Sequence, residues 1–403
     1  MASSITKDVD QYPNIPYADK DSQYYDKTPY ASFKSIYRPL VDESKPKKAR
    51  TYFNKSSLVP FCLALTLSIC VFLIYIKFFT KTTGNQLMYM PEDLALLKSK
   101  FEQYKNQFNK VYPDEETNNL RFHNFVRSYQ HLFAIGASDG DAVFELNHFS
   151  DWSDDELKTI LMKKEQFQEF KKNLPPTLRM ANLSENYFNG IDFDWRTKGV
   201  VGPVANQGNC GSCGYFSAVG VVESMNAIAG HKLVTLSKQE LIDCDLSNHG
   251  CSGSYPYALL TYMQKHGVVS EDDYKYEGRR GTCRHVDGAR VFVDHAYHIP
   301  QNEGSMAQSL RQIGPFSIIV AVTRELFAYK KGVFDPSGSD CRGKSVGLHA
   351  LDVVGYGNEN GKDYWIVKNS WSTSFGEDGY VKWRRGANSC GIAEYACGVT
   401  VKK

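Results

Sequence analysis

The chain of 403 residues has almost no excess of either charge, since 47 Lys and Arg side chains oppose 45 Asp and Glu for a formal net charge of +2. Proteins that bind nucleic acid usually carry a strong basic excess, so this balance argues against a nucleic-acid partner. We find no internal repeat. Gly355, Gly357 and Gly361 lack the spacing of a phosphate-binding loop, and no Ser or Thr follows Lys362, so this stretch is interpreted as a turn.

Cysteine is scarce in the first half of the chain. Only Cys62 and Cys70 precede residue 209, whereas eight cysteines follow it. Such a concentration indicates an oxidising compartment for the second half. The length allows two or three domains, and a hydrophobic content of 42% is enough for a buried core.

Residues 1–57 lack any helical or strand period and are rich in Tyr, Lys, Asp and Ser, so we predict a disordered tail. Loose matches to the tyrosine sorting signal occur at 12–15 (YPNI), 30–33 (YASF) and 37–40 (YRPL). Because a tyrosine-rich tail yields such matches by chance, the sequence does not decide which of them is used.

Residues 58–76 form a run without any charge, LVPFCLALTLSICVFLIYI. This is about the length of a helix that crosses a bilayer. Basic residues between positions 45 and 55 precede the run, and Lys77 and Lys81 follow it. The positive-inside rule then keeps the tail in the cytoplasm and places the rest of the chain on the lumenal side. We predict an uncleaved signal anchor of a single-pass type II membrane protein, because the run begins late and exceeds the usual cleavable core.

A helical stripe begins after Pro91 and ends at Pro113. Its apolar members recur three and four residues apart, at Leu94, Leu97, Phe101, Tyr104 and Phe108. A second helix is expected from about 114 to 133. Residues 143–149 alternate like a short strand.

The composition and periodicity of the sequence change at about Ile191. Before it, the polar stretch 166–190 contains Pro175-Pro176 and is typical of a linker, and Asn182 begins a glycosylation sequon. After it, helical patterns come first, with a capping box at Ser237 and a helix over 256–266. Strands follow, at 291–297, 316–322, 350–356, 364–368 and 380–384.

The reactive chemistry centres on residues 207–217, QGNCGSCGYFS. Apolar residues recur at helical spacing as far as Ala229, and Gly230 is a stop signal, so a helix is predicted to begin near Cys213. A helix N-terminus favours an anion, and the thiolate is the reactive form of cysteine. On this stretch alone, Cys213 could also be half of a disulfide, a buried apolar residue, or the redox partner of Cys210.

A thiolate nucleophile needs a base and a group that orients the base. His349 precedes the predicted strand 350–356, and Asn369 follows the predicted strand 364–368. An asparagine amide can hold a histidine in one orientation. Taken singly, a structural histidine and a turn asparagine are the commoner interpretations.

The joint pattern resembles the papain family of cysteine proteases. Its core is the Gln207–Cys213 motif, a histidine 136 residues after Cys213, and Asn-Ser-Trp beginning 156 residues after it. Further matches are Asp194–Arg196, Asp243–Asp245, Gly250–Gly253, Val354–Gly357, Tyr364–Trp365, Lys368–Trp371 and Gly376–Tyr380. Upstream, Arg121, Phe125, Leu132, Asn147, Phe149 and Asp151 fit parts of the family's propeptide motifs.

The resemblance implies an α+β, two-domain fold with an active-site cleft between a helical domain and a β-barrel-like domain. It implies an inhibitory helical pro-region over 92–165, a linker and processing region over 166–190, and a peptidase domain over 191–403. It also implies a cysteine endopeptidase that is made as a zymogen, acts on proteins and peptides, is inhibited by its own propeptide, and uses no metal or cofactor. Similar membrane-anchored proteases of parasitic protists act in acidic endosomal, lysosome-like or digestive compartments.

The resemblance also implies roles for individual residues. Cys213 would attack the peptide carbonyl and form a thioester, and His349 would protonate the leaving amine. Asn369 would orient His349, and Trp371 would shield their contact from water. The side-chain amide of Gln207 and the backbone N–H of Cys213 would form the oxyanion hole.

The substrate contacts implied by the resemblance are Gly253, Ser254, Tyr255, Pro256, Leu348, Ala350 and Tyr395. Most are apolar, so we expect a hydrophobic side chain at the second substrate residue before the cut bond, in a pocket that Tyr395 makes shallow. The implied disulfides are Cys210–Cys251, Cys244–Cys283 and Cys341–Cys390, which leave Cys397 unassigned.

Two departures from the family pattern favour competing hypotheses. Gly214 replaces a large aromatic residue, usually tryptophan, and is expected to remove packing beside Cys213 and to add backbone freedom. Ser254 replaces the second glycine of a cleft-lining pair and is expected to crowd the substrate backbone. A catalytically weak papain-fold binding protein is therefore the main alternative. A thiol–disulfide oxidoreductase that uses Cys210 and Cys213 is a third hypothesis.

Overall fold

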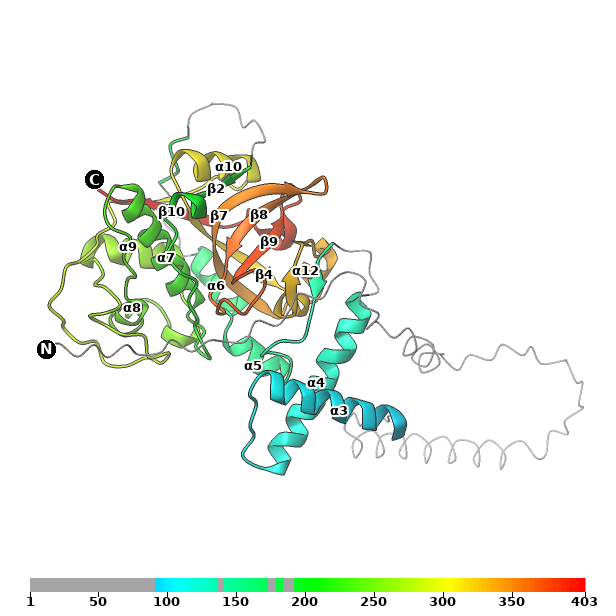
Figure 1. Ribbon diagram of the computed structural model, residues 1–403. Helices are drawn as coiled ribbons and strands as arrows, with labels where there is room; N and C mark the ends of the chain where they lie inside the picture. Colours follow the sequence, from blue (N-terminus) through cyan, green and yellow to red (C-terminus); the bar gives the residue numbers. More distant parts are fainter. Residues whose placement is uncertain (1–90, 137–140, 173–178, 184–191, 403) are drawn as a thin grey trace, which may run out of the picture. The chain divides into compact units, whose positions relative to one another are not determined.

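The computed structural model describes residues 91–136, 141–172, 179–183 and 192–402 (Figure 1). The predicted tail, 1–57, and the predicted membrane anchor, 58–76, lie outside the described residues. Among the helices of the described part, none is both long and apolar enough to cross a membrane.

Two long helices, both expected from their apolar spacing, open the described chain. These helices, α3 (Pro91–Gln107) and α4 (Glu115–Gly136), cross each other (Figure 1). They bury a small core of their own, made of Leu97, Phe101, Tyr104, Phe122, Phe125 and Val126. The rings of Phe101 and Phe125, for example, lie 5.3 Å apart. The predicted pro-region therefore has its own stabilising cluster.

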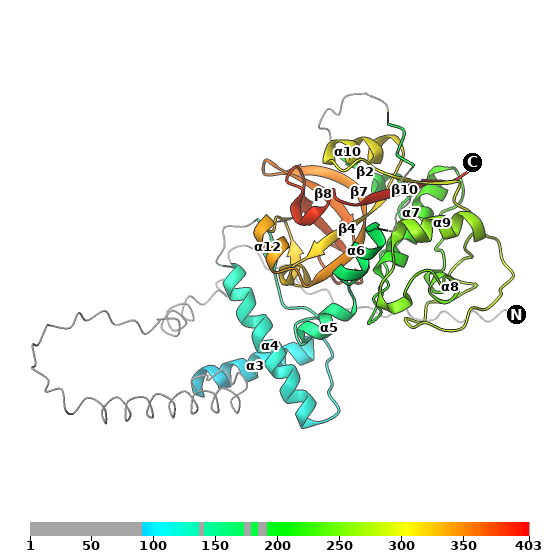
Figure 2. The same cartoon turned by 180° about the vertical axis from the view of Figure 1, so that it is seen from behind.

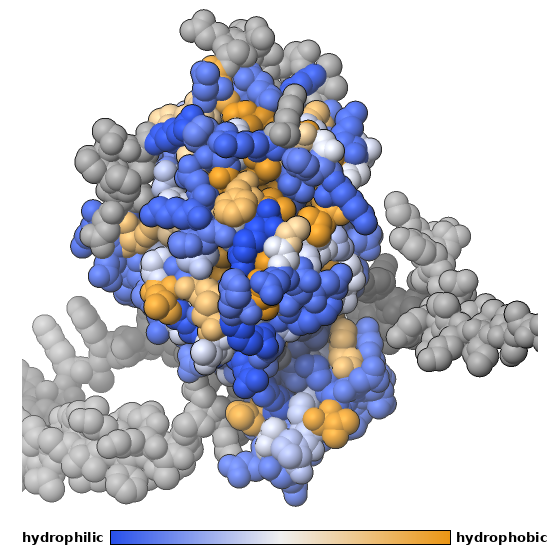
Figure 3. Space-filling model, turned by 90° about the vertical axis from the view of Figure 1, so that its left-hand side faces the viewer, coloured by the Kyte–Doolittle hydropathy of each residue, from blue (hydrophilic) through white to orange (hydrophobic). Residues whose placement is uncertain are grey.

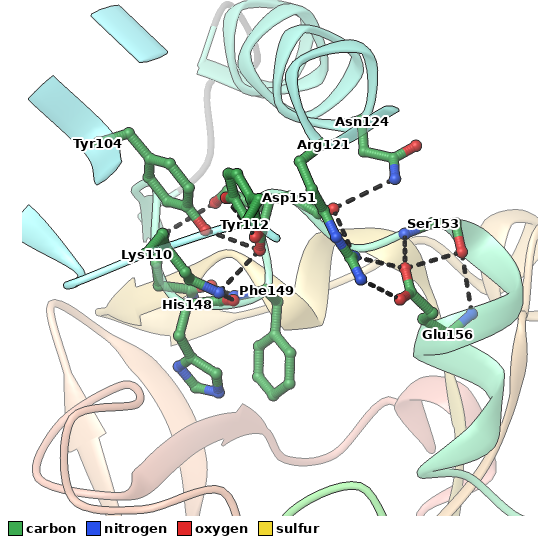
Figure 4. Close-up of polar contacts among 12 residues, drawn as sticks. Tyr104, Lys110, Tyr112, Arg121, Asn124, His148, Phe149, Asp151, Ser153 and Glu156 are labelled. Atoms are coloured by element: carbon green, nitrogen blue, oxygen red, sulfur yellow. Dashed lines mark hydrogen bonds and ion pairs between the residues drawn. The ribbon is translucent and has the colours of Figure 1, made fainter. Parts of the chain in front are cut away.

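A buried carboxylate joins these helices to the segment that follows (Figure 4). Asp151 accepts hydrogen bonds from Tyr104 at 2.9 Å, from Lys110 at 2.9 Å and from Tyr112 at 2.8 Å. Because all three donors come from α3 or the loop after it, Asp151 fixes where the chain leaves this core.

A second charged contact holds the short helix α5 (Asp154–Thr159). The two guanidinium nitrogens of Arg121 donate to the two carboxylate oxygens of Glu156 at 2.8 and 2.6 Å. Glu156 also completes a capping box with Ser153, so one carboxylate both starts α5 and ties it to α4 (Figure 4).

The strand expected over residues 143–149 is shorter in the structure. Only β1 (Val143–Phe144) forms, and it pairs with β5 (Tyr329–Lys331). Asn147 then makes a turn, because its side chain accepts from Phe149 N at 3.0 Å while its own N–H donates to Ser150 Oγ at 2.9 Å. Such side chain–backbone bonds compete with a strand ladder.

Three helices form the first part of the peptidase region: α7 (Cys213–Ile228), α8 (Lys238–Cys244) and α9 (Pro256–His266). Ser237 caps α8 by accepting from Glu240 N at 3.0 Å. The return bond of the predicted capping box is replaced, because the Glu240 carboxylate accepts from Val269 N and Arg290.

An eight-stranded sheet forms the second part, in the order β3-β10-β4-β7-β8-β9-β6 with β2 paired to β7. The strands are β2 (Phe193–Asp194), β3 (His295–His298), β4 (Phe316–Val322), β6 (Val333–Phe334), β7 (Gly347–Glu359), β8 (Lys362–Lys368), β9 (Tyr380–Arg384) and β10 (Ala396–Thr400). All these pairs are antiparallel except β6 with β9. The expected order of helices before sheet is therefore observed.

Some elements differ from the expectations. The strand predicted over 291–297 forms only as β3, and β7 is longer than predicted because it also pairs with β4 from Gly347 and closes a hairpin with β8. Four further elements were not predicted: β10, α10 (Glu303–Gln312), α11 (Arg324–Phe327) and α12 (Gly338–Gly343).

The helical part and the sheet each have a hydrophobic core. In both views α7 lies between α9 and the sheet (Figures 1 and 2). The face in Figure 3 is mostly hydrophilic, with apolar side chains in smaller patches between polar ones. Disulfides join Cys210 to Cys251, Cys244 to Cys283 and Cys341 to Cys390, which are the pairs that the resemblance implied.

Candidate active site

The predicted nucleophile is the first residue of α7. Cys213 is a free, fully buried thiol. Cys210 is bonded to Cys251, so the pair Cys210 and Cys213 forms no disulfide. The predicted helix forms, and 14 of the 16 residues of α7 are buried, so protein surrounds it on all sides. Burial raises the pKa of the Cys213 thiol to about 11, against the opposing effect of nearby backbone N–H groups.

The predicted base and its orienter are in contact. His349, on β7, lies with Nε2 2.8 Å from Oδ1 of Asn369, the residue that follows β8. The same Oδ1 accepts from the N–H of Ser370 at 2.7 Å, which identifies it as the oxygen of the amide. The Nε2 atom must therefore carry the imidazole proton, and Nδ1 is left as the proton acceptor.

The histidine is enclosed. The ring of Trp371 stacks on the His349 ring at 4.6 Å, and Phe149 of the pro-region meets Trp371 edge-on at 5.2 Å. His349 Nδ1 is buried and has no hydrogen-bond partner among the described residues. Burial lowers the pKa of His349 to about 4, although its bond to Asn369 opposes this. In this form the thiol and the imidazole are both neutral.

The side-chain amide of Gln207 is engaged by the pro-region. Its Nε2 donates to the carbonyl of Ile160 at 2.9 Å and to that of Cys210 at 2.8 Å. Its Oε1 accepts from Ser370 Oγ at 2.7 Å. Since an amide has two N–H hydrogens, both are used, and one of them binds a pro-region carbonyl.

The pro-region continues across the site as an extended segment. Met162 and Leu348 exchange two backbone hydrogen bonds, at 2.7 and 2.9 Å. A Cβ on Gly211 would lie 2.8 Å from the carbonyl oxygen of Thr159, and one on Gly347 would lie 2.9 Å from Leu161. The two glycines therefore permit the close approach of this segment.

A helix of the pro-region then covers the predicted substrate pocket. It is α6 (Lys164–Lys172), which lies largely within the stretch assigned to the linker, so the packed pro-region extends beyond residue 165. The ring of Phe170 lies parallel to that of Tyr255 at 4.1 Å, and Phe167 meets Tyr395 edge-on at 5.5 Å. Phe167 is only 5% exposed.

The structure also places the other predicted pocket residues here. Tyr255, Ala350 and Tyr395 are buried in one hydrophobic cluster, which Leu348 borders half-buried. Pro256 is buried at the start of α9, and Gly253 faces Met162, whose Cγ would lie 3.7 Å from an added Cβ. Trp371 contacts His349 and Phe149 and is 1% exposed, so in this form it encloses the histidine. Asn182 is exposed.

The two unusual residues, Gly214 and Ser254, contact each other. A Cβ on Gly214 would lie 2.5 Å from both the carbonyl oxygen and Oγ of Ser254. Ser254 is 1% exposed, and its hydroxyl is directed at α7 rather than into the cleft. Ser254 therefore packs against Gly214 and fills the space beside it. The expectation that Ser254 crowds the substrate backbone stays a prediction.

Several residues of the site were not among the predicted site residues. Ile160, Met162, Phe167 and Phe170 come from the pro-region, and Tyr276 contacts Gln207. Ser370 also contacts Gln207, and it belongs to the Asn-Ser-Trp motif although no role was expected for it. Two aromatic residues three positions apart in a lysine-rich stretch could have revealed α6, because that spacing is helical. The contacts of Ser370 and Tyr276 with Gln207 join residues far apart in the sequence, so no local sequence pattern indicates them.

Comparison with known proteins places this geometry in a family. Residues 190–400 match the model "Papain family cysteine protease" and residues 101–157 match "Cathepsin propeptide inhibitor domain (I29)". Pro-cathepsin H of Mus musculus is 36% identical over 313 residues, which cover 75% of this chain and 90% of that protein. Digestive cysteine proteinase 1 of Homarus americanus is 35% identical over 321 residues, 76% of this chain and 96% of that protein.

The solved structures lead to the same family. Digestive procathepsin L 3 from the larval midgut of Tenebrio molitor is 31% identical, with a TM-score of 0.65, and the match covers 76% of this chain and 99% of that one. The helical and sheet parts with the cleft residues between them are thus a papain-like α+β fold, preceded by a propeptide. This chain belongs to the papain family of cysteine proteases, which are hydrolases, and it carries a cathepsin propeptide inhibitor domain before its peptidase domain.

Proposed function

We propose that this protein is a cysteine endopeptidase made as a membrane-anchored zymogen, with Cys213, His349 and Asn369 as its catalytic residues. The observation that carries the proposal is the bond from Gln207 Nε2 to the carbonyl of Ile160. A pro-region carbonyl occupies one donor of the predicted oxyanion hole, and Cys213 is fully buried in this form. The arrangement fits a complete site whose donor is held by its inhibitor.

Removal of the pro-region would change the charge state of the pair. Without Met162 and Phe149, water reaches Cys213 and His349, so the burial that keeps both neutral is relieved. The thiol can then transfer its proton to Nδ1 of His349, which is unprotonated because Nε2 bonds Asn369. The thiolate attacks the peptide carbonyl carbon, the carbonyl electron pair moves to oxygen, and the Gln207 amide and the Cys213 N–H stabilise that oxygen.

The second half of the reaction uses the same groups. The imidazolium of His349 returns its proton to the leaving amine as the C–N bond breaks and the thioester forms. Water then attacks the thioester, with His349 as base, and releases the acid and the free thiol. The apolar pocket of Tyr255, Ala350 and Tyr395 would bind a hydrophobic side chain two residues before the cut bond.

The cellular arrangement is part of the proposal. Residues 58–76 would anchor the chain as a single-pass type II membrane protein, with a cytoplasmic tail at 1–57 and the peptidase domain lumenal in an acidic endosomal, lysosome-like or digestive compartment. Processing would fall between the packed helix α6 and the start of the peptidase domain at about 191. The exposure of Asn182 in this interval is compatible with glycosylation.

The test is proteolysis itself. Residues 91–403 are expressed, processed at acidic pH with a thiol, and assayed with reporter peptides that differ in the second residue before the cut bond. Wild type should cleave peptides with hydrophobic residues there, and Cys213→Ala should lose activity by a factor of 10³ or more. Equal inertness of the two proteins would favour the binding-protein alternative.

The topology is tested separately in intact vesicles that carry the full chain. Added protease should digest the tail at 1–57 and leave the peptidase domain intact. A tail that is digested only after lysis of the vesicles would overturn the orientation.

A further inference from the structure

The hydroxyl of Tyr276 lies between two parts of the proposed site. It is 2.8 Å from the backbone carbonyl oxygen of Gln207 and 2.9 Å from Oγ of Ser212. Ser212 is the residue before Cys213 and the N-cap position of α7. One hydroxyl thus joins the residue with the oxyanion donor to the start of the nucleophile's helix.

The direction of these hydrogen bonds follows from their chemistry. The Gln207 carbonyl can only accept, so the proton of Tyr276 goes to it. The Ser212 hydroxyl can then give its one hydrogen to the tyrosine oxygen at 2.9 Å, and the carbonyl of Cys210, 3.3 Å from Oγ, is the competing acceptor. Burial raises the pKa of Tyr276 to about 12, so the phenol stays protonated over the range in which a protease works. The Tyr276 ring also meets Phe216 of α7 edge-on at 5.0 Å, which fixes its position.

The other anchors of Gln207 show what Tyr276 adds. The backbone N–H of Gln207 donates to Ser370 O at 2.9 Å, and Oε1 accepts from Ser370 Oγ at 2.7 Å. These two bonds hold the residue from the side of Asn369. Tyr276 holds it from the side of α7. When the pro-region is removed, the side-chain amide of Gln207 loses its hydrogen bond to the Ile160 carbonyl. The orientation of the amide then depends on the hydrogen bonds that remain.

We propose that Tyr276 is a positioning residue for the oxyanion donor, which acts through the backbone of Gln207. This inference rests on the proposed proteolytic function. A misplacement of a donor by a fraction of an ångström weakens stabilisation of the transition state more than binding of the substrate. Loss of the hydroxyl should therefore lower kcat and leave KM nearly unchanged.

The test uses Tyr276→Phe in the processed enzyme, with rates expressed per titrated active site. We expect kcat to fall about ten-fold, less than the hundred-fold or greater loss that follows removal of a donor. The inhibition constant of a peptide aldehyde should rise by a similar factor. In that adduct the sulfur of Cys213 bonds to the aldehyde carbon and the carbonyl electron pair moves to oxygen, which needs the oxyanion hole.

Alkylation of Cys213 by iodoacetamide is the contrasting readout, because sulfur displaces iodide and no oxyanion forms. Its rate should not change in Tyr276→Phe. A parallel loss of alkylation would mean that the nucleophile or its helix is damaged, and it would overturn the positioning role. Unchanged kcat and unchanged aldehyde inhibition would overturn it as well.

Two further variants complete the design. Tyr274→Phe removes a buried hydroxyl that bonds Asp243 at 2.8 Å and does not contact Gln207, so its kcat per site should equal that of wild type. In a Gln207→Ala background, Tyr276→Phe should have no additional effect on kcat, whereas an undiminished ten-fold loss would overturn action through Gln207. A wild type that binds the aldehyde but cleaves no peptide would instead contradict the proposed function alone.

Discussion

At the scale of single residues, Gly214 and Ser254 are one structural feature rather than two defects. Each departs from the family pattern, and Ser254 occupies the space that a side chain at 214 would need, since a Cβ there would collide with it. The first residue after the nucleophile therefore packs tightly in spite of having no side chain. The lack of a side chain at Gly214 is therefore a weaker argument against catalytic activity.

This contact predicts the effect of restoring a side chain. Gly214→Ala should destabilise the zymogen by about 1–3 kcal/mol, although alanine favours helices, because the nearest obstacle is a backbone carbonyl that cannot rotate away. Adding Ser254→Gly should recover part of the loss by removing Oγ. The measurement is urea unfolding in a Cys213→Ala background, which prevents self-cleavage.

Gly136→Ala is the matched control, since a Cβ there meets no atom within 4 Å. It should be neutral or slightly stabilising. A Gly214→Ala protein that is more stable than its parent would contradict the predicted collision between the alanine Cβ and Ser254.

At the scale of elements, the pro-region holds the cleft at three separate places. The Ile160 carbonyl occupies the Gln207 amide, Met162 pairs with Leu348, and α6 lies over the pocket. The short helix α5 precedes these contacts and is tied to α4 by the Arg121–Glu156 pair. Loosening α5 or α6 should therefore speed processing without a change in the catalytic residues.

The first element prediction concerns α6. Phe170→Ala removes a parallel ring contact with Tyr255 together with its apolar area, and such aromatic pairs contribute about 0.5–1.5 kcal/mol beyond area burial. The full zymogen should process about ten-fold faster at acidic pH, as followed by gel densitometry. Leu120→Ala, an exposed apolar position on α4, should process at the wild-type rate. Equal rates for the two variants would argue that α6 has no inhibitory role.

The second prediction at this scale concerns α5 and the pH at which the zymogen is processed. Partial burial raises the pKa of Glu156, but its bonds to Arg121 and Ser153 lower it more, so the net pKa lies below the ordinary value. Its stabilisation is therefore present at neutral and mildly acidic pH and is lost only as pH falls through that lowered pKa. Glu156→Gln should let processing begin at a higher pH and run several-fold faster.

Asp155→Asn is the control, because this carboxylate is 92% exposed on the same helix and pairs only with Lys158 among the described residues. Its pH profile of processing should match that of wild type. The role of Glu156 is refuted by a Glu156→Gln profile that is superimposable on both.

At the scale of the whole molecule, a buried charged cluster lies where α7 meets the sheet, next to the proposed catalytic residue Asn369. Asp352 of β7 is opposite Lys368 of β8, and Glu223, Lys238 and Ser217 are nearby. The cluster borders a small cavity of about 20 Å³. One oxygen of Asp352 has no hydrogen-bond partner in the part of the chain that the structure describes. A carboxylate there is costly to ionise.

The cluster predicts a pH-dependent stability. Burial raises the pKa of Asp352 to about 7, although Lys368 opposes the shift. Between about pH 4 and 7 the folded state then binds more protons than the unfolded chain, so the free energy of unfolding falls as pH rises through this range. Asp352→Asn should be more stable than its parent at pH 7.5, by up to a few kcal/mol, and the gain should be less than half as large at pH 5.

Urea unfolding of the Cys213→Ala zymogen at the two pH values measures this difference. Asp287→Asn, at a fully exposed position, should show none. An Asp352→Asn protein that is equally destabilised at both pH values would mean that the carboxylate contributes a needed hydrogen bond and not a pH-dependent cost.

Through the resemblance, the sequence by itself predicted the family, the three disulfide pairs, and Cys213, His349, Asn369 and Gln207 as site residues. These features are written as short motifs at characteristic spacings, and helices α3, α4 and α9 follow from local apolar periodicity. The charge-free run at 58–76 likewise needs only local composition to be identified as a candidate anchor.

The tertiary structure decided what local patterns cannot encode. It extended the packed pro-region into α6, placed the Ile160 carbonyl on the side-chain amide of Gln207, set Ser254 against Gly214, and brought Tyr276 to Gln207. Each of these contacts joins residues far apart in the chain, and their partners are chosen by shape and burial in the folded core. The spacing of residues fixes which chemical groups are available, and packing decides which of them are held, shielded or free to react.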